Sequence, residues 1–161
     1  MSHSISPLIT AEELIQLNLS EIILIDARTG ADAFEIYQKE HLKGARFVDL
    51  NRDLAAVTEN PANGGRHPLP TVEEFTETLS AIGISPSDHV VVYDDKNGSN
   101  FAARFWWMMR AVGHEKIQVL NGGFQSAIQS GFPTSSGIEI FDKTTYPVQE
   151  WKLPLAEIEE V

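Results

Sequence analysis

Hydrophobic residues along the chain follow two alternating patterns. Short runs rich in Val and Ile are separated by longer stretches in which apolar residues recur with helical spacing. The run VVVY at residues 90–93 is apolar at every position, as expected of a strand covered by helices on both faces. This alternation predicts an α/β fold with a parallel sheet connected through helices. The expected strands are residues 22–25, 46–48, 90–93 and 117–120.

Helix starts are marked by capping-box patterns, in which a hydroxyl side chain is followed three residues later by a glutamate. Thr10 precedes Glu13 in this way, and Thr71 precedes Glu74. The second of these helices is expected to end at Gly83, because glycine readily adopts the left-handed conformation that ends helices. Further helices are expected over residues 100–112 and 124–130.

Two stretches lack a regular pattern. Residues 51–70 are rich in Asn, Gly and Pro, which indicates a long loop of a kind that is often functional. From residue 134 onward the periodicity weakens. We expect a single domain over residues 1–133 and a linker over residues 134–161, with the segment after Phe141 leaving the globular part.

The charge balance and the lack of cysteine narrow the possible functions. Lys and Arg number 12 against 23 Asp and Glu, and the resulting net charge of −11 repels nucleic-acid phosphates and anionic lipid. The chain contains no Cys, which excludes disulfides, thiolate metal sites and any mechanism that uses a thiolate of this chain. No apolar run reaches the roughly 20 residues of a membrane span, and the polar start does not resemble a secretory signal. We therefore expect a cytoplasmic protein with no nucleic-acid or membrane partner.

The turn after residues 90–93 is the first candidate for chemistry, because ligands of open α/β sheets bind at the carboxyl ends of strands. Asp94 and Asp95 begin this turn, and a helix start follows. A helix N-terminus favours anions, whereas paired carboxylates could hold Mg²⁺ or accept a phosphoryl group. We favour the structural interpretation, in which the aspartates end the strand and Asn100 caps the helix. No tight Mg²⁺ site is expected, because Lys96 neutralises part of the acidic field.

Other polar residues have both structural and functional interpretations. Asp26 and Arg28, at another strand end, are expected to form a buried brace. His41 is expected to be a hydrogen-bonded turn residue rather than a ligand. His67 lies in the long loop beside Arg66, where a structural role and contact with a small anion are both open.

The helix expected after the Asp94 turn is unusually rich in large apolar residues. Trp106, Trp107, Met108 and Met109 are adjacent, and one helix stripe cannot hold them all. We expect some of them to present an apolar face beside the Asp94 turn, together with apolar residues of the tail. Such a face is typical of an interface. The apolar residues expected to contribute from the tail are Trp151, Leu153 and Leu155.

Over residues 9–132 the sequence resembles the rhodanese-type sulfurtransferases. The blocks that carry the resemblance are LIDAR at 24–28, YQKEHLKGA at 37–45, VVVYD at 90–94 and AARFWWMMRAVGHEKIQVLNGG at 102–123. The second block matches the family's signature with Lys43 in place of Pro, and the fourth is similar to the N-terminal half of tandem thiosulfate and 3-mercaptopyruvate sulfurtransferases. The resemblance implies a rhodanese-like three-layer α/β/α fold with a central parallel sheet.

In catalytic members of this family, a Cys that carries the persulfide follows the strand equivalent to residues 90–93. Asp94 occupies that position here, and a carboxylate cannot accept a sulfane sulfur. The resemblance therefore implies an inactive rhodanese domain that needs no cofactor. Its implied partner is a C-terminal catalytic rhodanese domain of the same polypeptide, with a small anionic sulfur donor, thiosulfate or 3-mercaptopyruvate, in the shared cleft.

Mercaptopyruvate-type members also have an Asp and a His in the loop equivalent to residues 51–70, and both are thought to assist a Ser of the other domain. His67 matches that His, whereas the acidic position falls on Asn51 and leaves Asp49 as a substitute. The resemblance places His67 on the loop rim near the Asp94 turn. The candidate cleft residues are His67, Arg66, Asp49 and Asp95.

Three functions are open at this point. The first is a non-catalytic domain of a tandem sulfurtransferase, and the second is a stand-alone regulatory or protein-binding module of the same family. The third is a metal- or phosphate-handling domain that uses Asp94 and Asp95. The first two differ in whether the reading frame continues beyond Val161, and the third depends on Mg²⁺ binding.

Overall fold

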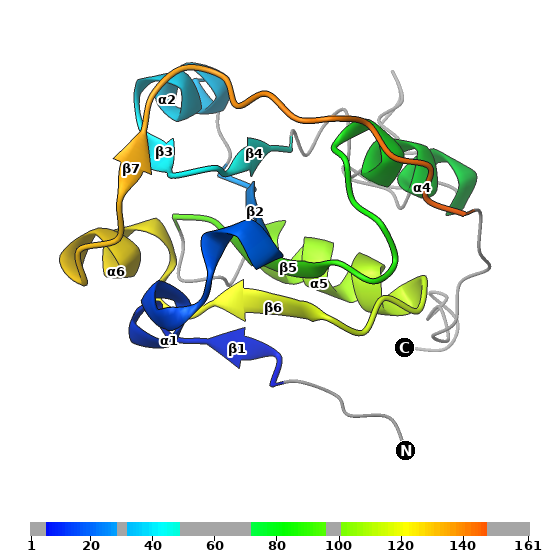
Figure 1. Cartoon of the computed structure of the whole chain (residues 1–161), viewed down its shortest axis with the longest axis horizontal. Coiled ribbons are helices and arrows are strands. Elements are labelled where there is room, and N and C mark those ends of the chain that lie inside the picture. The colour runs from blue at the N-terminus through cyan, green and yellow to red at the C-terminus, as the bar shows by residue number, and fades with distance from the viewer. Residues whose placement is uncertain (1–5, 29–31, 49–71, 96–100, 148–161) are drawn as a thin grey trace, which may run out of the picture.

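A parallel sheet forms the centre of the computed structural model, which describes residues 6–28, 32–48, 72–95 and 101–147 (Figure 1). Within these residues the sheet has five strands in the order β1-β6-β5-β2-β4, and every neighbouring pair is parallel. The expected parallel sheet is thus confirmed. The strands are β1 (Leu8–Ile9), β2 (Ile22–Asp26), β4 (Arg46–Phe47), β5 (His89–Tyr93) and β6 (Ile117–Leu120).

The register of the central strands brings polar residues to one edge of the sheet. Asp26, the last residue of β2, lies opposite Tyr93 of β5 and Phe47 of β4. Because all these strands run in the same direction, their carboxyl ends meet at this edge, and Asp94 follows directly from β5. The fold therefore collects Asp26, Tyr93 and Asp94 at the end of the sheet where α/β proteins bind ligands.

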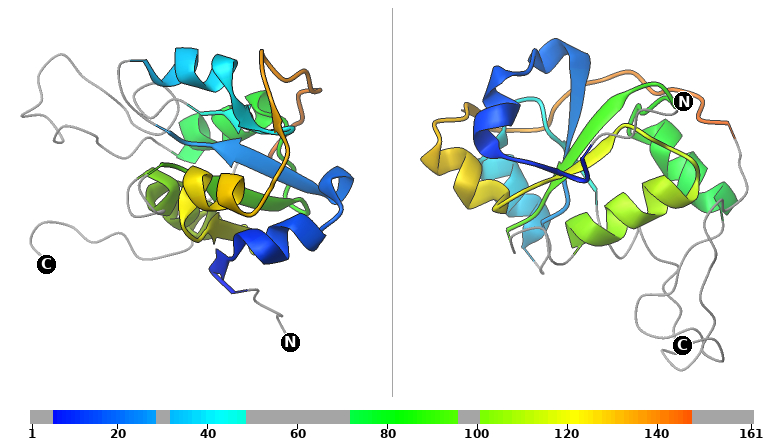
Figure 2. Two further views of the ribbon diagram at one scale, coloured as in Figure 1. Left: turned by 90° about the vertical axis from the view of Figure 1, so that its left-hand side faces the viewer. Right: turned by 90° about the horizontal axis from the view of Figure 1, so that it is seen from below.

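Helices cover both faces of the sheet and complete three layers (Figure 2). Helices α4 (Val72–Ala81) and α5 (Phe101–Ala111) pack with Val90 and Val92 of β5 in one buried cluster. Helices α1 (Ala11–Gln16) and α6 (Gly123–Gln129) pack on the other face, where Val91 and Tyr93 point. This alternation follows from the two-residue period of a strand, and it explains why the run VVVY has no polar position.

The capping box predicted at Thr10 is present at the start of α1. The backbone N–H of Glu13 donates to Thr10 Oγ1 at 3.1 Å, and the N–H of Thr10 donates to Glu13 Oε1 at 3.0 Å. Thr71 lies outside the described residues, although α4 begins at Val72 as expected. The sequence did not predict the short helices α2 (Ala33–Lys39) and η1 (Leu19–Glu21). None of the helices in the described part of the chain is long and apolar enough to cross a membrane.

The segment after residue 133 returns across the domain. Its strand β7 (Thr134–Ser135) pairs antiparallel with β3 (His41–Leu42) in a separate two-stranded sheet. Farther along, the N–H of Gly137 donates to Gln38 O at 2.7 Å, and the N–H of Thr144 donates to Ser80 O at 3.0 Å. These bonds tie the segment first to α2 and then to α4, as the course of the chain in Figure 1 shows.

The expectation that the segment after Phe141 leaves the domain is wrong as far as Tyr146. Tyr146 is 4% exposed and belongs to the buried cluster of α4 and α5, and Phe141 packs against that cluster. An irregular segment has no periodic pattern, but separate hydrogen bonds and single apolar anchors hold it in place. Residues 148–161, which include the remaining part of the expected linker, lie outside the described residues.

Gly83, which follows α4, lies close to this segment, and it gives a testable prediction. Gly83 has φ of +80°, and an added Cβ would lie 2.6 Å from Asp142 O and 2.7 Å from Arg46 Nη1. Gly83→Ala is expected to lower the free energy of unfolding by about 2–4 kcal/mol, from backbone strain and from displacement of Asp142.

Gly44→Ala is the matched control, since Gly44 has φ of +84° with no atom within 4 Å of an added Cβ. This variant carries only the cost of the backbone conformation, about 1–2 kcal/mol. Urea titrations of both variants measure the difference. Equal losses would show that residues 141–142 do not press on Gly83.

Candidate functional site

The carboxyl edge of the sheet is built around a buried ion pair between Asp26 and Arg28. Arg28 Nη2 donates to Asp26 Oδ2 at 2.7 Å and Arg28 Nε donates to the same oxygen at 3.0 Å, with exposed fractions of 5% and 0% for the two side chains. The hydroxyl of Tyr93 also donates to Asp26 Oδ2, at 2.8 Å. Because three strong donors converge on one carboxylate, Asp26 joins β2 to β5 and to the loop that follows β2.

Arg28 also contacts an aromatic ring and a backbone carbonyl oxygen, both of which stabilise a cation. Its guanidinium lies 4.2 Å from the centre of the Phe124 ring, and Nη2 donates to Glu40 O at 2.6 Å. Burial acts to lower the pKa of Arg28, but the hydrogen bonds and charge of Asp26 outweigh it, so this pKa lies above its usual value. Burial, and then the charge of Asp26, raise the pKa of Tyr93 well above its usual value.

Arg28 therefore keeps its charge and Tyr93 keeps its proton over the physiological range of pH. Groups fixed in one protonation state are poor candidates for proton transfer, which requires a pKa near the working pH. The sequence-based prediction that Asp26 and Arg28 form a structural brace is confirmed. The contribution of the Tyr93 hydroxyl to this brace was not predicted, because a Tyr at the end of an apolar run is usually a core residue. The signal that could have indicated it is the pairing of Tyr93 with Asp26 in the strand register.

Asp94 connects β5 to the first turns of two helices. Its side chain is 1% exposed, and Oδ2 accepts the backbone N–H of Ala102 at 3.1 Å, near the start of α5. Its carbonyl oxygen accepts the N–H of Phe124 in α6 at 2.9 Å. A carboxylate at a helix N-terminus is stabilised by the free N–H groups and the helix dipole. Asp94 thus supplies its own negative charge to the place where the sequence suggested an anion could bind.

Asp95 differs from Asp94 in its surroundings. Its side chain is half-buried, and Oδ1 has no hydrogen-bond partner among the described residues although that atom is shielded from solvent. Its charge adds to the raised pKa of Arg28, after the larger effect of Asp26. Residues 96–100, including Asn100 and Lys96, lie outside the described residues. Within the described residues, no group of three or more His, Asp or Glu side chains could hold a metal ion.

His41 is hydrogen-bonded, as predicted, but it lies in β3 rather than in a turn. Nδ1 lies 2.8 Å from Tyr37 O, Nε2 lies 2.7 Å from Glu139 Oε2, and the ring stacks on Tyr37 with 4.1 Å between centres. Both ring nitrogens are therefore engaged, and His41 fastens residues 134–147 to α2 and β3. The other sequence candidates, Arg66, His67, Asn51 and Asp49, lie outside the described residues, so the expected position of His67 near the Asp94 turn stays a prediction.

Helix α5 buries more of its apolar residues than expected. Met108 and Met109 are fully buried, and Trp106 and Trp107 pack partly buried against the cluster of α4 and α5. Within the described part of the chain, the large hydrophobic side chains that are exposed lie elsewhere. Among the described residues of the expected apolar face, only the indoles of Trp106 and Trp107 are partly exposed, whereas Trp151, Leu153 and Leu155 lie outside the described residues.

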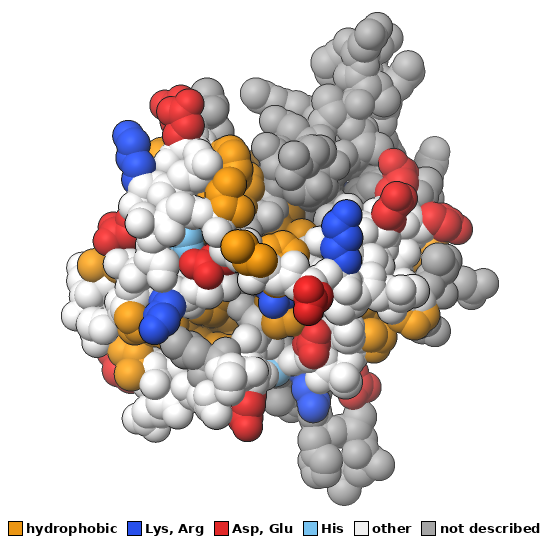
Figure 3. Space-filling view, turned by 45° about the horizontal axis from the view of Figure 1, so that its top comes forward, with side chains coloured by type: hydrophobic (Ala, Val, Ile, Leu, Met, Phe, Trp, Pro, Cys, Tyr) orange, Lys and Arg blue, Asp and Glu red, His pale blue; other side chains and the backbone are white. Residues whose placement is uncertain are grey.

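Four of the seven large hydrophobic side chains that are exposed in the described part of the chain lie in α2 and in the segment that crosses it. Phe34 and Ile36 are 45% and 46% exposed, and Ile138 and Ile140 are 61% and 98% exposed. Figure 3 shows hydrophobic side chains gathered on this side of the molecule, with acidic and basic side chains interspersed around them. The remaining exposed side chains of this kind are Leu8, Ile15 and Ile128.

Comparison with known proteins places the chain in a family. Residues 10–129 match the Rhodanese-like domain family, and the chain belongs to it. The chain is 34% identical over 140 residues to a probable 3-mercaptopyruvate sulfurtransferase of Pseudomonas aeruginosa, which covers 83% of this chain and 49% of that protein. It is 41% identical over 103 residues to the thiosulfate sulfurtransferase of Cricetulus griseus, which covers 62% of this chain and 32% of that protein.

A solved structure supports the same assignment. The 3-mercaptopyruvate sulfurtransferase from Leishmania major superposes with a TM-score of 0.73 and 30% sequence identity, covering 89% of this chain and 39% of that one. The molecule is therefore a rhodanese domain homologous to thiosulfate and 3-mercaptopyruvate sulfurtransferases. It spans half, or less, of the length of these relatives.

Proposed function

We propose that this chain is the non-catalytic rhodanese domain of a tandem thiosulfate or 3-mercaptopyruvate sulfurtransferase. It forms one wall of the active-site cleft, while the Cys that carries the persulfide lies on a following domain. The observation that carries this proposal is the burial and hydrogen bonding of Asp94. The residue at the family's Cys position is a buried carboxylate that accepts the N–H of Ala102, and the chain contains no Cys.

The chemistry of sulfur transfer explains why this observation decides between active and inactive domains. A thiolate attacks the transferable sulfur of the donor and forms a sulfur–sulfur bond, while the bond from that sulfur to the rest of the donor breaks and its electron pair leaves with sulfite or with the enolate of pyruvate. The Cys then holds the sulfur as a persulfide until an acceptor takes it. The oxygens of Asp94 cannot make that bond. The carboxylate instead holds β5 to the start of α5, so the position of the nucleophile in active members has a structural task here.

The proposed cleft residues supply charge rather than a nucleophile. Arg66 and His67 would attract an anionic sulfur donor, with Asp49 as a carboxylate partner for His67. Asp95 is the fourth proposed cleft residue, and its Oδ1 has no hydrogen-bond partner among the described residues. The lengths of the relatives support a second domain, since each has at least as much chain again beyond the part that matches.

Sulfurtransferase assays test this proposal. The isolated chain is expected to form no thiocyanate from thiosulfate and cyanide, and no pyruvate from 3-mercaptopyruvate, because it has no Cys to carry the transferred sulfur. Asp94→Ala should stay equally inactive. Turnover that co-purifies with the folded chain, and is lost when one of its residues is changed, would contradict the proposal.

Co-expression with the segment encoded downstream of Val161 tests the tandem arrangement. Activity is expected to appear in the complex and to depend on a Cys of the added segment. We also expect the two pieces to elute together in size exclusion. A reading frame that stops at Val161 would instead support a stand-alone regulatory or protein-binding module.

A further inference from the structure

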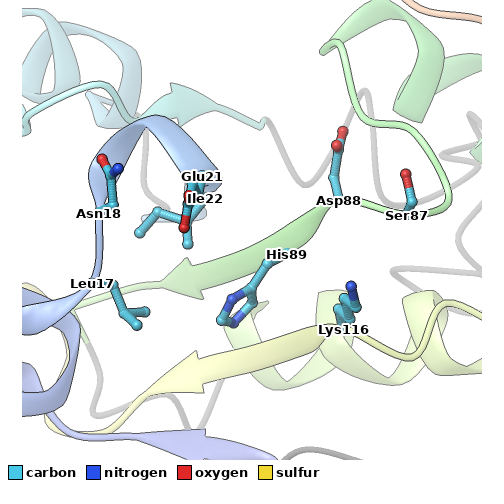
Figure 4. Close-up of a pocket in the computed structure, with 8 residues that line it drawn as sticks. All are labelled: Leu17, Asn18, Glu21, Ile22, Ser87, Asp88, His89 and Lys116. Carbon is cyan, nitrogen blue, oxygen red and sulfur yellow. The ribbon is translucent and has the colours of Figure 1, made fainter.

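A cavity of about 420 Å³ opens at the amino ends of β2, β5 and β6, the opposite end of the sheet from Asp94 (Figure 4). One wall is formed by Leu17, Asn18, Glu21 and Ile22, and the other by residues 87–89 with Lys116. Its volume is within the range of small-molecule sites. The family's chemistry takes place at the other edge of the sheet, so this cavity is separate from the proposed cleft.

Two linked hydrogen bonds determine which ring nitrogen of His89 carries the hydrogen in this cavity. Gln118 Nε2 donates to Ser6 O at 2.9 Å, which orients the amide so that its Oε1 faces His89. His89 Nε2 lies 2.8 Å from that oxygen and must therefore carry the hydrogen. In the neutral ring, Nδ1 is consequently an acceptor, and it has no partner among the described residues.

The cavity is lined by an acidic and a basic side chain that lie on opposite walls. Glu21 and Lys116 lie on opposite walls, as Figure 4 shows, and neither side chain makes an ion pair within the described residues. Asp88 is already engaged, because its Oδ2 accepts the N–H of Ser85 at 2.8 Å. Leu17 and Ile22 add apolar surface to the wall that carries Glu21.

We propose that this cavity binds a small zwitterion of the α-amino acid class. The ammonium group donates to Glu21 and to His89 Nδ1, the carboxylate accepts from Lys116, and a short side chain contacts Leu17. A simple anion would meet Glu21 and Asp88, and a simple cation would leave Lys116 unmatched. Only a ligand with both charges complements both walls. This inference does not depend on the proposed role in sulfur transfer.

Titration of the ¹⁵N-labelled chain with L-alanine tests the proposal by NMR. We expect saturable shifts of the amide signals around Ile22, His89 and Lys116, with a dissociation constant of about 1 mM. Propionate and ethylamine are the matched probes, since each lacks one of the two charges of alanine, and each should bind at least about tenfold more weakly. No saturable shift with alanine up to about 20 mM, or equal binding of either probe, would overturn the proposal.

Charge-neutralising variants test the assigned contacts. Glu21→Gln and Lys116→Gln are each expected to weaken alanine binding about tenfold or more, and both side chains are exposed, so folding should persist. Glu35→Gln and Lys143→Gln change exposed charges outside the cavity and should bind alanine as the unmodified chain does. Binding retained by both cavity variants would overturn the assignment.

Discussion

Asp26→Asn is expected to lower the free energy of unfolding by about 3–5 kcal/mol, because it leaves a buried cation without its counter-ion. Asp26 is fully buried, and its carboxylate receives the guanidinium of Arg28 and the hydroxyl of Tyr93. The asparagine keeps the shape of the side chain but not its charge. Chemical denaturation followed by Trp fluorescence measures the loss.

A double variant separates the charge from the packing. In Asp26→Asn with Arg28→Met, the cation is removed together with its partner, and the Met side chain packs on the Phe124 ring that the guanidinium covers. This variant is expected to recover at least about half of the stability lost in the single one, since replacing both partners of a buried pair costs less than removing one. A double variant as unstable as Asp26→Asn would show that the loss comes from local packing.

Asp94→Ala is expected to cost about 2–3 kcal/mol of stability. The substitution removes the acceptor of the Ala102 N–H at the start of α5 and leaves a small void at a position that is 1% exposed. It also removes a negative charge from a helix N-terminus. The loss is expected to appear as local opening of α5, measured by amide hydrogen exchange, as well as in global unfolding.

The adjacent aspartate is the control for this second prediction. Asp95→Ala should change stability by less than about 0.5 kcal/mol, because Asp95 is half-buried and its Oδ1 has no hydrogen-bond partner in the described part of the chain. A cost as large as that of Asp94→Ala would contradict the assignment of Asp94 as the structural anchor. The pair of variants therefore tests whether the family's nucleophile position has become part of the framework.

The resemblance to catalytic rhodanese domains connects the stability effect expected at Asp94 with function. Where active members keep an accessible thiolate, this chain buries a carboxylate and uses it to hold β5 to α5 and α6. Under the proposed function, the domain contributes shape and charge to a cleft whose reactive group lies on the following domain. Sulfur-transfer activity should therefore be insensitive to the chemistry at position 94 as long as the domain stays folded.

The sequence by itself determined the α/β class and the central strands of the sheet, although the short edge strand β1 was not predicted. The strands predicted at 22–25, 90–93 and 117–120 agree with β2, β5 and β6 to within one residue at each end. Apolar runs and capping pairs such as Thr10 with Glu13 are local properties, so neighbours in the chain suffice to recognise them. The brace between Asp26 and Arg28 was equally local, since the partners are two residues apart.

Only the tertiary structure decided the contacts between distant segments. The packing of Tyr146, the donation from Tyr93 to Asp26 and the pairing of His41 with Glu139 each join segments far apart in the chain. The cavity beside His89 likewise combines three separate segments. No periodicity encodes such contacts, because they arise only when strand register and chain reversal bring isolated side chains together. Residues 134–147 therefore looked like a linker in the sequence and became part of the domain in the fold.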